Sequence, residues 1–249
     1  MTALRIGASL WAAGVRGALE YRADFLLMTL MGLVRQGVGI ALMWVILKRF
    51  ETIAGWTLGE VAFLYGMRLT ALALCGLGGD IWALQYLVRV GEFDRFLVRP
   101  VRPLLQLLTR HVPLSAFGDL LGGVALLVAA TRLVDVAWTP RAILYLLQAL
   151  LGGGLIQLAM RLLIASFSFR ALSVNALMGI VDKLFNEFGT YPLSIFNATL
   201  QLLLTFAIPV AFMAYFPAAV LLGRTGELQV QPLIAYGAPL AGVAWMAIA

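Results

Sequence analysis

The stretch FLLMTLMGLVRQGVGIALMWVIL, residues 25–47, decides the class of fold. Arg35 is its only charged residue, and at about 1.5 Å of helical rise per residue the stretch can cross a hydrocarbon layer of about 30 Å. The rest of the chain is similar, because 62% of its 249 residues are hydrophobic and only 12% are charged. A soluble domain has about 25% charged residues and could not bury so much apolar surface. We therefore predict an all-α polytopic membrane protein.

Further apolar segments along the chain complete six transmembrane helices in a single domain over residues 1–249. These segments are about 58–79, 114–130, 142–165, 171–189 and 232–249. Before the first span, residues 3–20 have an apolar face and a charged face. This pattern predicts an amphipathic helix lying in the membrane interface, with Trp11 at the level of the lipid headgroups.

The segment YPLSIFNATLQLLLTFAIPVAFMAYFPAAVLLGR, residues 191–224, is apolar but interrupted by Pro192, Pro209 and Pro217. Proline breaks helices because it lacks a backbone N–H and clashes with the preceding turn. The pieces between these prolines are mostly too short to span a bilayer. We predict a re-entrant pair of half-helices that enters and leaves on one side and is shielded from lipid by the protein.

The distribution of Lys and Arg predicts a cytoplasmic N-terminus. With this topology, ten of the 18 Lys and Arg residues lie in the cytoplasm, five lie outside and three lie at membrane depth. The cytoplasmic ten are Arg5, Arg16, Arg22, Arg89, Arg95, Arg99, Arg102, Arg110, Arg161 and Arg170. The net charge of +6 thus reflects orientation in a membrane rather than binding to nucleic acid.

Residues 80–112 then form a cytoplasmic connection, whose most charged part is GEFDRFLVRPVRP, residues 91–103. Acidic residues come first and basic residues later, as the dipole of a short helix favours, between a glycine that ends the preceding helix and prolines that stop this one. Helical spacing places Phe93, Phe96 and Leu97 on one face. This face could insert into a groove on a cytoplasmic partner or rest on the bilayer, and spacing alone does not choose between the two.

Six charged or polar residues are predicted at membrane depth, where an arginine costs about 2.5–3.5 kcal/mol on insertion scales. They are Arg35, Arg68, Asp182, Lys183, Asn186 and Glu187. We expect Arg35 to find a carboxylate or a backbone carbonyl within the bundle. In the fifth span, i,i+4 spacing places Asp182 and Asn186 on one face. The same spacing places Lys183 and Glu187 on one face. Such groups either lock helix to helix or line a polar pathway.

Chemistry for making or breaking bonds is not visible in the sequence. Neither lysine follows a phosphate-binding glycine loop, and no motif of a serine hydrolase, a zinc protease or a paired-carboxylate enzyme occurs. The single cysteine, Cys75, and the single histidine, His111, cannot build a disulfide framework or a zinc site. We therefore expect no catalytic residue, no metal site and no cofactor on this chain.

The order of these segments resembles the permease subunits of bacterial type-two ABC exporters. The resemblance covers nearly the whole chain and is carried by GEFDRFLVRPVRPLLQLL after the second span and by the proline-interrupted segment before the last span. In that family the first motif has the pattern G-x-[FL]-D-x-x-L-x-[RK]-P. The resemblance implies ATP-driven export of a drug, a lipid or a glycan-like molecule through the bacterial cytoplasmic membrane by alternating access.

The resemblance also implies partners and roles for residues. Two permeases, identical or paralogous, would assemble among membrane lipids with two cytoplasmic ABC ATPase subunits that bind ATP and Mg²⁺. The coupling helix that contacts the ATPase would comprise Glu92, Phe93, Asp94, Arg95, Phe96, Leu97, Arg99 and Pro100. The extracellular re-entrant segment, 191–224, would cap the pathway. Pathway or gate candidates are Pro192, Pro209 and Pro217 together with Arg35, Arg68, Asp182, Lys183, Asn186 and Glu187.

Two other functions compete with this one. An ion-coupled secondary transporter would use Asp182 or Glu187 as its proton or ion site, but the inverted repeats of such carriers are not visible. A membrane enzyme or assembly scaffold would need acidic, His or Ser residues clustered at one membrane face, and the sequence shows no such cluster. An ATPase partner with a phosphate loop would distinguish a transporter subunit from both.

Overall fold

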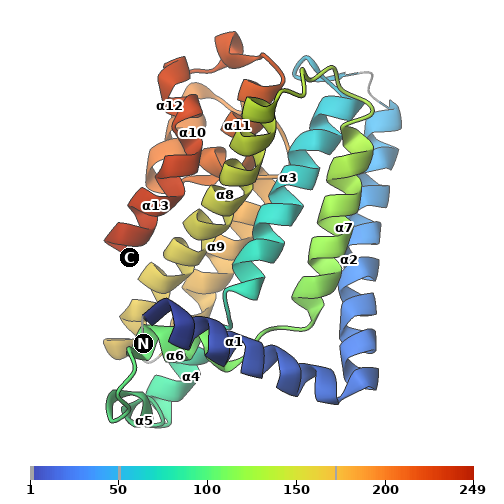
Figure 1. Ribbon diagram of the computed structural model, residues 1–249. Helices are drawn as coiled ribbons and strands as arrows, with labels where there is room; N and C mark the ends of the chain where they lie inside the picture. The colour runs from blue at the N-terminus through green and yellow to red at the C-terminus, as the bar shows by residue number, and fades with distance from the viewer. Residues whose placement is uncertain (1–2, 50–51, 172) are drawn as a thin grey trace.

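The structure is a computed structural model that describes residues 3–49, 52–171 and 173–249. Long helices run side by side along an upright bundle, and α1 lies across its lower end (Figure 1). The first elements are α1 (Ala3–Glu20), α2 (Arg22–Arg49), a two-stranded antiparallel hairpin of β1 (Thr52–Ile53) and β2 (Trp56–Thr57), and α3 (Leu58–Leu77). We refer to the end that carries the hairpin as the upper end.

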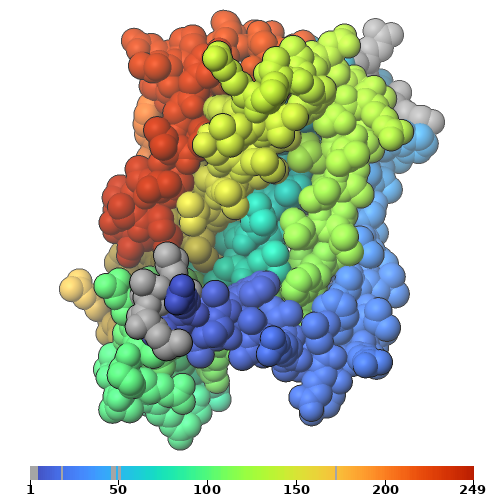
Figure 2. All heavy atoms as spheres, in the orientation of Figure 1, coloured from blue at the N-terminus to red at the C-terminus, as the bar shows by residue number. Residues whose placement is uncertain are grey.

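The chain then turns at the lower end and returns. Three short helices form this turn: α4 (Ala83–Arg89), α5 (Asp94–Leu97) and α6 (Pro103–Arg110). The first two project beyond α1, whereas α6 lies against it (Figure 1, Figure 2). The bundle continues with α7 (Ser115–Ala130), α8 (Pro140–Ser166), a 3-10 turn (Phe167–Phe169) and α9 (Asn175–Phe188). The last part comprises a 3-10 turn (Leu193–Ile195), α10 (Ala198–Leu202), two π-helical turns (Leu203–Ala207 and Ala211–Tyr215), α11 (Phe216–Leu221), a 3-10 turn (Thr225–Glu227), α12 (Pro232–Tyr236) and α13 (Ala238–Ile248).

Local sequence signals start two of the long helices. At the start of α3, the Glu60 carboxylate accepts a hydrogen bond from the Thr57 N–H at 2.7 Å, and the Thr57 hydroxyl accepts one from the Glu60 N–H at 3.4 Å. This reciprocal capping box satisfies two backbone groups that have no partner within the helix. Thr139 caps α8 by accepting from the Ala142 N–H at 3.2 Å, directly before Pro140.

Three segments are long and apolar enough to cross a bilayer, namely Arg22–Val45, Leu58–Leu77 and Pro140–Phe169. Two bent pairs reach that length only together. They are α6 with α7, bent by 77°, and Ala198–Ala207 with Ala211–Leu221, bent by 86°. The described residues therefore hold three to five candidate spans. The prediction of a helical membrane protein is confirmed, whereas the predicted number of six spans is not.

The predicted fifth and sixth spans are shorter in the structure. With 14 residues, α9 covers about 21 Å at about 1.5 Å per residue, less than a hydrocarbon core of about 30 Å. The last predicted span is divided at Gly237 into α12 and the 11-residue α13. Pro239 stands in the first turn of α13, where its missing N–H needs no partner, so a new helix begins there.

The proline-rich segment follows the prediction at two of its three prolines. Pro192 precedes a 3-10 turn, and Pro209 lies at the bend of 86°. Such a bend is the geometry of a broken span or of a re-entrant loop. Pro217, in contrast, stands in the first turn of α11 directly after a π-helical turn and does not interrupt the helical run. Its predicted role as a break was wrong, because a wider π turn can accommodate the shift in hydrogen bonding that proline requires.

Helix α1 packs on the lower end of the bundle. The indole N–H of Trp11 donates to the carbonyl of Leu77 at 3.1 Å, and Gly7 comes close to Leu105 of α6. Trp11 is thus tied to the end of α3, and its position at the level of the lipid headgroups stays a prediction. The last carbonyls of a helix have no intrahelical partner, and the indole N–H satisfies one of them at the end of α3.

The run Gly152-Gly153-Gly154 lets α8 touch three neighbours closely. A Cβ on Gly152 would lie 2.8 Å from the carbonyl oxygen of Pro239 in α13. One on Gly153 would lie 2.7 Å from the carbonyl oxygen of Met213, and one on Gly154 would lie 3.0 Å from that of Ala71 in α3. Because successive helical residues point about 100° apart, three adjacent glycines serve three directions. Small residues of this kind are how helices pack closely in membranes.

Glycines also fix the crossing of α2 and α7. A Cβ on Gly118 would clash with the carbonyl oxygen of Thr29, and one on Gly32 would lie 2.5 Å from the carbonyl oxygen of Ser115. Gly37, in contrast, has nothing within 4 Å of a built Cβ. The close crossing therefore depends on Gly32 and Gly118, and it holds α2 where Arg35 can reach α7.

We predict that Gly118→Ala separates α2 from α7 and lowers the thermal unfolding temperature of the protein in detergent. Overpacking of this kind costs about 1–3 kcal/mol. The matched control, Gly37→Ala, adds the same methyl group to open space on α2 and should be neutral or gain up to about 1 kcal/mol of helix propensity. Equal unfolding temperatures for the two variants would contradict the close crossing.

Candidate functional site

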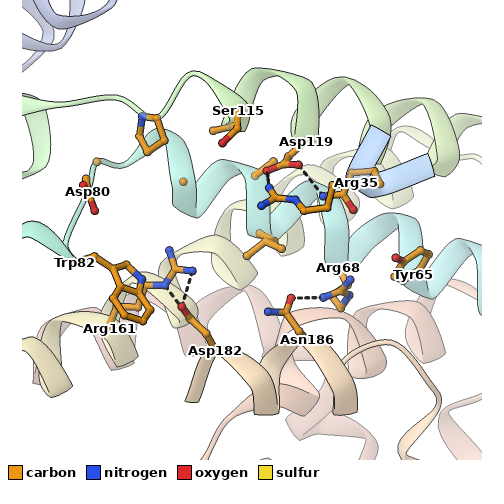
Figure 3. A pocket seen from close by; sticks show the side chains of 17 residues that line it. Arg35, Tyr65, Arg68, Asp80, Trp82, Ser115, Asp119, Arg161, Asp182 and Asn186 are labelled. Atoms are coloured by element: carbon orange, nitrogen blue, oxygen red, sulfur yellow. Dashed lines mark hydrogen bonds and ion pairs between the residues drawn. The ribbon is translucent and has the colours of Figure 1, made fainter. Parts of the chain in front are cut away.

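A polar cavity of about 500 Å³ lies among α2, α3, α7, α8 and α9 (Figure 3). Charged side chains from all five helices and from the loop after α3 line it. They are Arg35, Arg68, Asp80, Asp119, Arg161 and Asp182. Arg35 and Arg68 come from the middle of two helices that are long enough to cross a bilayer, so the cavity extends to membrane depth.

One wall of the cavity is an ion pair between α8 and α9. Arg161 holds Asp182 with two hydrogen bonds, from Nε to Oδ1 at 2.9 Å and from Nη2 to Oδ2 at 3.1 Å. The side-chain amide of Gln157 donates to the same carboxylate at 3.3 Å. Both charged side chains are largely buried, so each neutralises the other in a place where water screens little.

On the opposite wall, two residues of α2 donate hydrogen bonds to the same carboxylate. Asp119, on α7, accepts hydrogen bonds from the guanidinium of Arg35 and from the side-chain amide of Gln36, the latter at 2.8 Å. Asp119 is buried, whereas the Arg35 side chain is 63% exposed. The expectation that Arg35 finds a carboxylate within the bundle is confirmed.

Arg68, on α3, has a different environment. Its Nη1 donates to the Asn186 side-chain oxygen at 2.7 Å, and its guanidinium carbon lies 4.9 Å from the centre of the Tyr65 ring. The residue is only 5% exposed, and its buried Nε has no hydrogen-bond partner. Among the described residues no carboxylate oxygen comes within 4.0 Å of it. Arg68 is therefore a buried cation whose direct contacts are neutral, while the Glu187 carboxylate acts on it from a greater distance.

Asp182 and Asn186, which the sequence places on one face of the fifth predicted span, bond different helices. Asp182 bonds Arg161 of α8, and Asn186 bonds Arg68 of α3. Both residues thus connect α9 to other helices of the bundle. Lys183 is exposed and belongs to no ion pair within the part of the chain that the structure describes. The same is true of Glu187.

Two residues that the interpretation of the sequence missed are central to the cavity. Asp119 is the only charged residue in the third apolar segment, and an intramembrane carboxylate is a signal that the sequence does contain. Arg161 was predicted on the cytoplasmic side because it lies close to the end of the fourth segment. In the structure it points into the bundle toward Asp182 (Figure 3).

The lower end carries a second candidate site, the turn formed by residues 91–103. Gly91 adopts a φ of 74° and ends the preceding helix as predicted. The side-chain amide of Gln106 donates to the carbonyls of Phe96 at 3.0 Å and Val101 at 2.7 Å. These two hydrogen bonds attach the turn to α6. Helix α5 comprises only Asp94–Leu97, fewer residues than the predicted coupling helix.

The apolar face of this turn is not the predicted one. Phe96 is 9% exposed and packs into the protein, stacked at 5.9 Å on Phe93. Phe93 in turn meets the ring of Phe169, beyond the end of α8, at 5.0 Å. The side chains that protrude are Leu97, 60% exposed, and Val98, 83% exposed. The prediction that Phe93, Phe96 and Leu97 share one outward face was therefore wrong, because the phenylalanines anchor the turn from inside.

Exposed charged side chains lie close in sequence to Leu97 and Val98. Arg95, Arg99 and Arg102 are exposed, and so is Asp94. Glu92 lies 3.8 Å from Arg110 of α6 and faces the inner side of the turn. No group of three His, Cys, Asp or Glu side chains that could share a metal ion occurs within residues 3–49, 52–171 and 173–249.

Comparison with known families gave one match. A family model described as ABC-2 family transporter protein matches residues 33–249. The match includes all residues that line the cavity and the whole turn 91–103, whereas α1 lies outside it. No curated protein and no solved structure matched the chain.

The ion pair between Arg161 and Asp182 should show strong coupling in a double-mutant cycle. Arg161→Leu leaves Asp182 buried without a counter-charge and should lower the free energy of unfolding by about 3 kcal/mol. The double variant Arg161→Leu with Asp182→Leu should recover most of this loss. Lys183→Gln, which removes an exposed charge of the same helix α9 that belongs to no ion pair among the described residues, is the matched control and should change little. Additive effects of the two single substitutions would contradict the pairing.

Proposed function

We propose, from the premise that this chain belongs to the family of ABC-2 transporter proteins, that it is the permease of an ATP-driven exporter. Membership makes the chain a membrane component of an ABC transporter rather than its catalytic part. In the proposed assembly, two permeases, identical or paralogous, lie in the bacterial cytoplasmic membrane with two ATPase subunits. ATP and Mg²⁺ are bound by the ATPases, and this chain supplies the pathway.

The observation that carries the proposal is the protruding pair Leu97 and Val98 at the lower end. An exposed aliphatic pair with exposed arginines close to it in the chain suits a groove with an acidic rim on a partner protein. The turn is also firmly attached to the bundle, since Phe93 contacts Phe169 at the end of α8. A displacement of the turn by an ATPase would therefore reach α8, which contributes Arg161 to the cavity.

The upper end supports a gate. Residues 198–221 bend by 86° around Pro209, and the second half packs against α8 through Met213 and Gly153. We propose that this bent segment is re-entrant and caps the pathway on the outer side. Its π-helical turns have poorer hydrogen-bond geometry than an α-helix, which makes them suited to rearrangement.

The proposed orientation places the lower end in the cytoplasm and both termini inside, with α9 and α12–α13 completing six membrane passages. Moving Arg161 from the cytoplasmic set to membrane depth leaves nine of the 18 Lys and Arg residues inside and five outside. The excess of positive residues thus still favours a cytoplasmic lower end. The same side would have to carry the ATPases, because ATP is cytoplasmic.

The alternative of an ion-coupled carrier finds less support. Asp182 would have to gain and lose a proton or a cation, but two hydrogen bonds from Arg161 already engage both of its carboxylate oxygens. Glu187 is exposed and does not line the cavity. Neither candidate has the environment of a coupling-ion site.

Topology can be measured with membrane-impermeant maleimide in a Cys75→Ala background. We predict that Gly226→Cys, at the upper end, reacts in intact cells, and that Leu97→Cys reacts only after the cells are opened. The physical reason is that the excess of Lys and Arg retains the lower end inside. Labelling of Leu97→Cys in intact cells would reverse the proposed orientation.

The docking site can be tested by replacing Leu97 and Val98 with Ser. We expect the double variant to fold and insert normally but to bind its phosphate-loop ATPase at least about tenfold more weakly, a loss of about 1.4 kcal/mol, and to lose stimulation of ATP hydrolysis. The matched control is Leu133→Ser, at an equally exposed leucine of the upper end. Phe96→Ala should instead lower the stability of the permease itself.

If the Leu97→Ser, Val98→Ser variant copurified with the ATPase as well as the wild type and stimulated it equally, the proposed coupling surface would be refuted. A permease that brings down no ATPase with a phosphate loop under any condition would refute the proposed function as a whole.

A further inference from the structure

Arg68 differs from the other arginines of the cavity in having no carboxylate within 4.0 Å among the described residues. Arg35 pairs with Asp119 and Arg161 pairs with Asp182, whereas Arg68 bonds the neutral side chains of Asn186 and Tyr65, and Glu187 acts on it only from beyond that distance. A guanidinium has five N–H donors, and the Nε of Arg68 is buried without an acceptor. A buried cation in this condition is unfavourable unless an anion joins it.

The cavity is polarised as a result. Asp80, its remaining carboxylate, lies beside Arg161 at the end away from Arg68 (Figure 3). Around Arg68 the wall consists of neutral groups, among them Tyr65 and Leu72. Since the two ion pairs balance their own charges, the electrostatic potential at this end of the cavity is set by Arg68, opposed from outside the cavity lining by Glu187. An anion would find both a counter-charge and a free N–H donor there.

We propose that this cavity binds an oxyanion, a phosphate or carboxylate group of the transported molecule, and that Arg68 is its anchoring residue. This inference rests on the proposed export function and names the chemical class of its substrate. The volume of about 500 Å³ falls within the range of about 300–1,000 Å³ typical of small-molecule sites, so a headgroup or a small molecule fits. Apolar lining from Leu72, Ala73 and Ala116 and the ring of Trp82 would contact the rest of the ligand.

A purely structural role for Arg68 makes the opposite prediction for stability. If Arg68 serves only to tie α3 to α9 through Asn186, then Arg68→Met loses that tie and unfolds at a lower temperature. If Arg68 awaits an anion, the same substitution removes an uncompensated buried charge. The ligand-free Arg68→Met protein should then unfold at the same temperature as the wild type or higher.

Thermal unfolding of the purified full-length chain in a neutral detergent tests the proposal directly. The probes are dodecyl phosphate below its micelle-forming concentration, inorganic phosphate and, as a cationic control, dodecyltrimethylammonium. We expect dodecyl phosphate to raise the unfolding temperature in a saturable way, since a ligand that binds only the folded state stabilises it. A shift with inorganic phosphate as well would identify a free anion as sufficient, whereas a shift with dodecyl phosphate alone would identify an anionic amphiphile.

Variants separate Arg68 from general charge effects. The phosphate-induced shift should disappear in Arg68→Met, persist in part in Arg68→Lys, and remain complete in Arg141→Gln, an exposed position outside the cavity. An unshifted wild type with both phosphate probes, an equal shift in Arg68→Met, or a lower ligand-free unfolding temperature of Arg68→Met would each overturn the proposal. No ATPase is present, so failure here leaves the ATPase-binding experiment to decide the proposed function on its own.

Discussion

The structure depends on the cost of placing arginines at membrane depth. Each such side chain must meet an acceptor before its helix can remain in the bilayer, at a cost of about 2.5–3.5 kcal/mol on insertion scales if it does not. Arg35 meets Asp119 across α2 and α7, and Arg161 meets Asp182 across α8 and α9. These two requirements place the helices around one cavity. Gly118 of α7 and Gly32 of α2 then allow those two backbones to come close enough for the first pair to form.

The same constraint connects the cavity with the ends of the molecule. Helix α8 contributes Arg161 to the cavity, touches the bent upper segment through Gly153, and ends at the ring of Phe169, on which the lower turn rests. One rigid helix therefore contacts the proposed gate, the polar cavity and the proposed ATPase surface. Such an arrangement offers a mechanical route by which ATP-driven movement below could change access above, with a bound anion at Arg68 between the two.

Much of the fold could be predicted from the sequence, because the governing signal is one of composition and length. The spans around Arg35, Arg68 and Arg161 stand out as apolar runs, and the need of Arg35 for a carboxylate follows from its depth alone. The identity of that carboxylate did not follow, since Asp119 is 84 positions away and no local period relates the two. Which residues become partners across helices depends on how the helices pack. Gly32 of α2 packs against α7, and Gly153 and Gly154 of α8 pack against Met213 and Ala71. No single segment of the sequence encodes this packing.

The errors in the site have similar causes. Helical spacing put Phe96 and Leu97 on one face, but α5 is a single turn, and the bonds from Gln106 rotate Phe96 inward. Pro217 was interpreted as a break because the π turn before it leaves no mark in the sequence. In both places a tertiary contact or an unusual helical turn overrides the local pattern.

The central claim is that an anion at Arg68 and an ATPase at the lower turn belong to one ATP-driven cycle. The most direct measurement is the rate of ATP hydrolysis by the purified permease–ATPase complex in detergent, where no ion gradient exists, as dodecyl phosphate is added. The account predicts a saturable rise in the rate for the wild type and for Arg141→Gln, and no rise for Arg68→Met. An equal rise in Arg68→Met would contradict it.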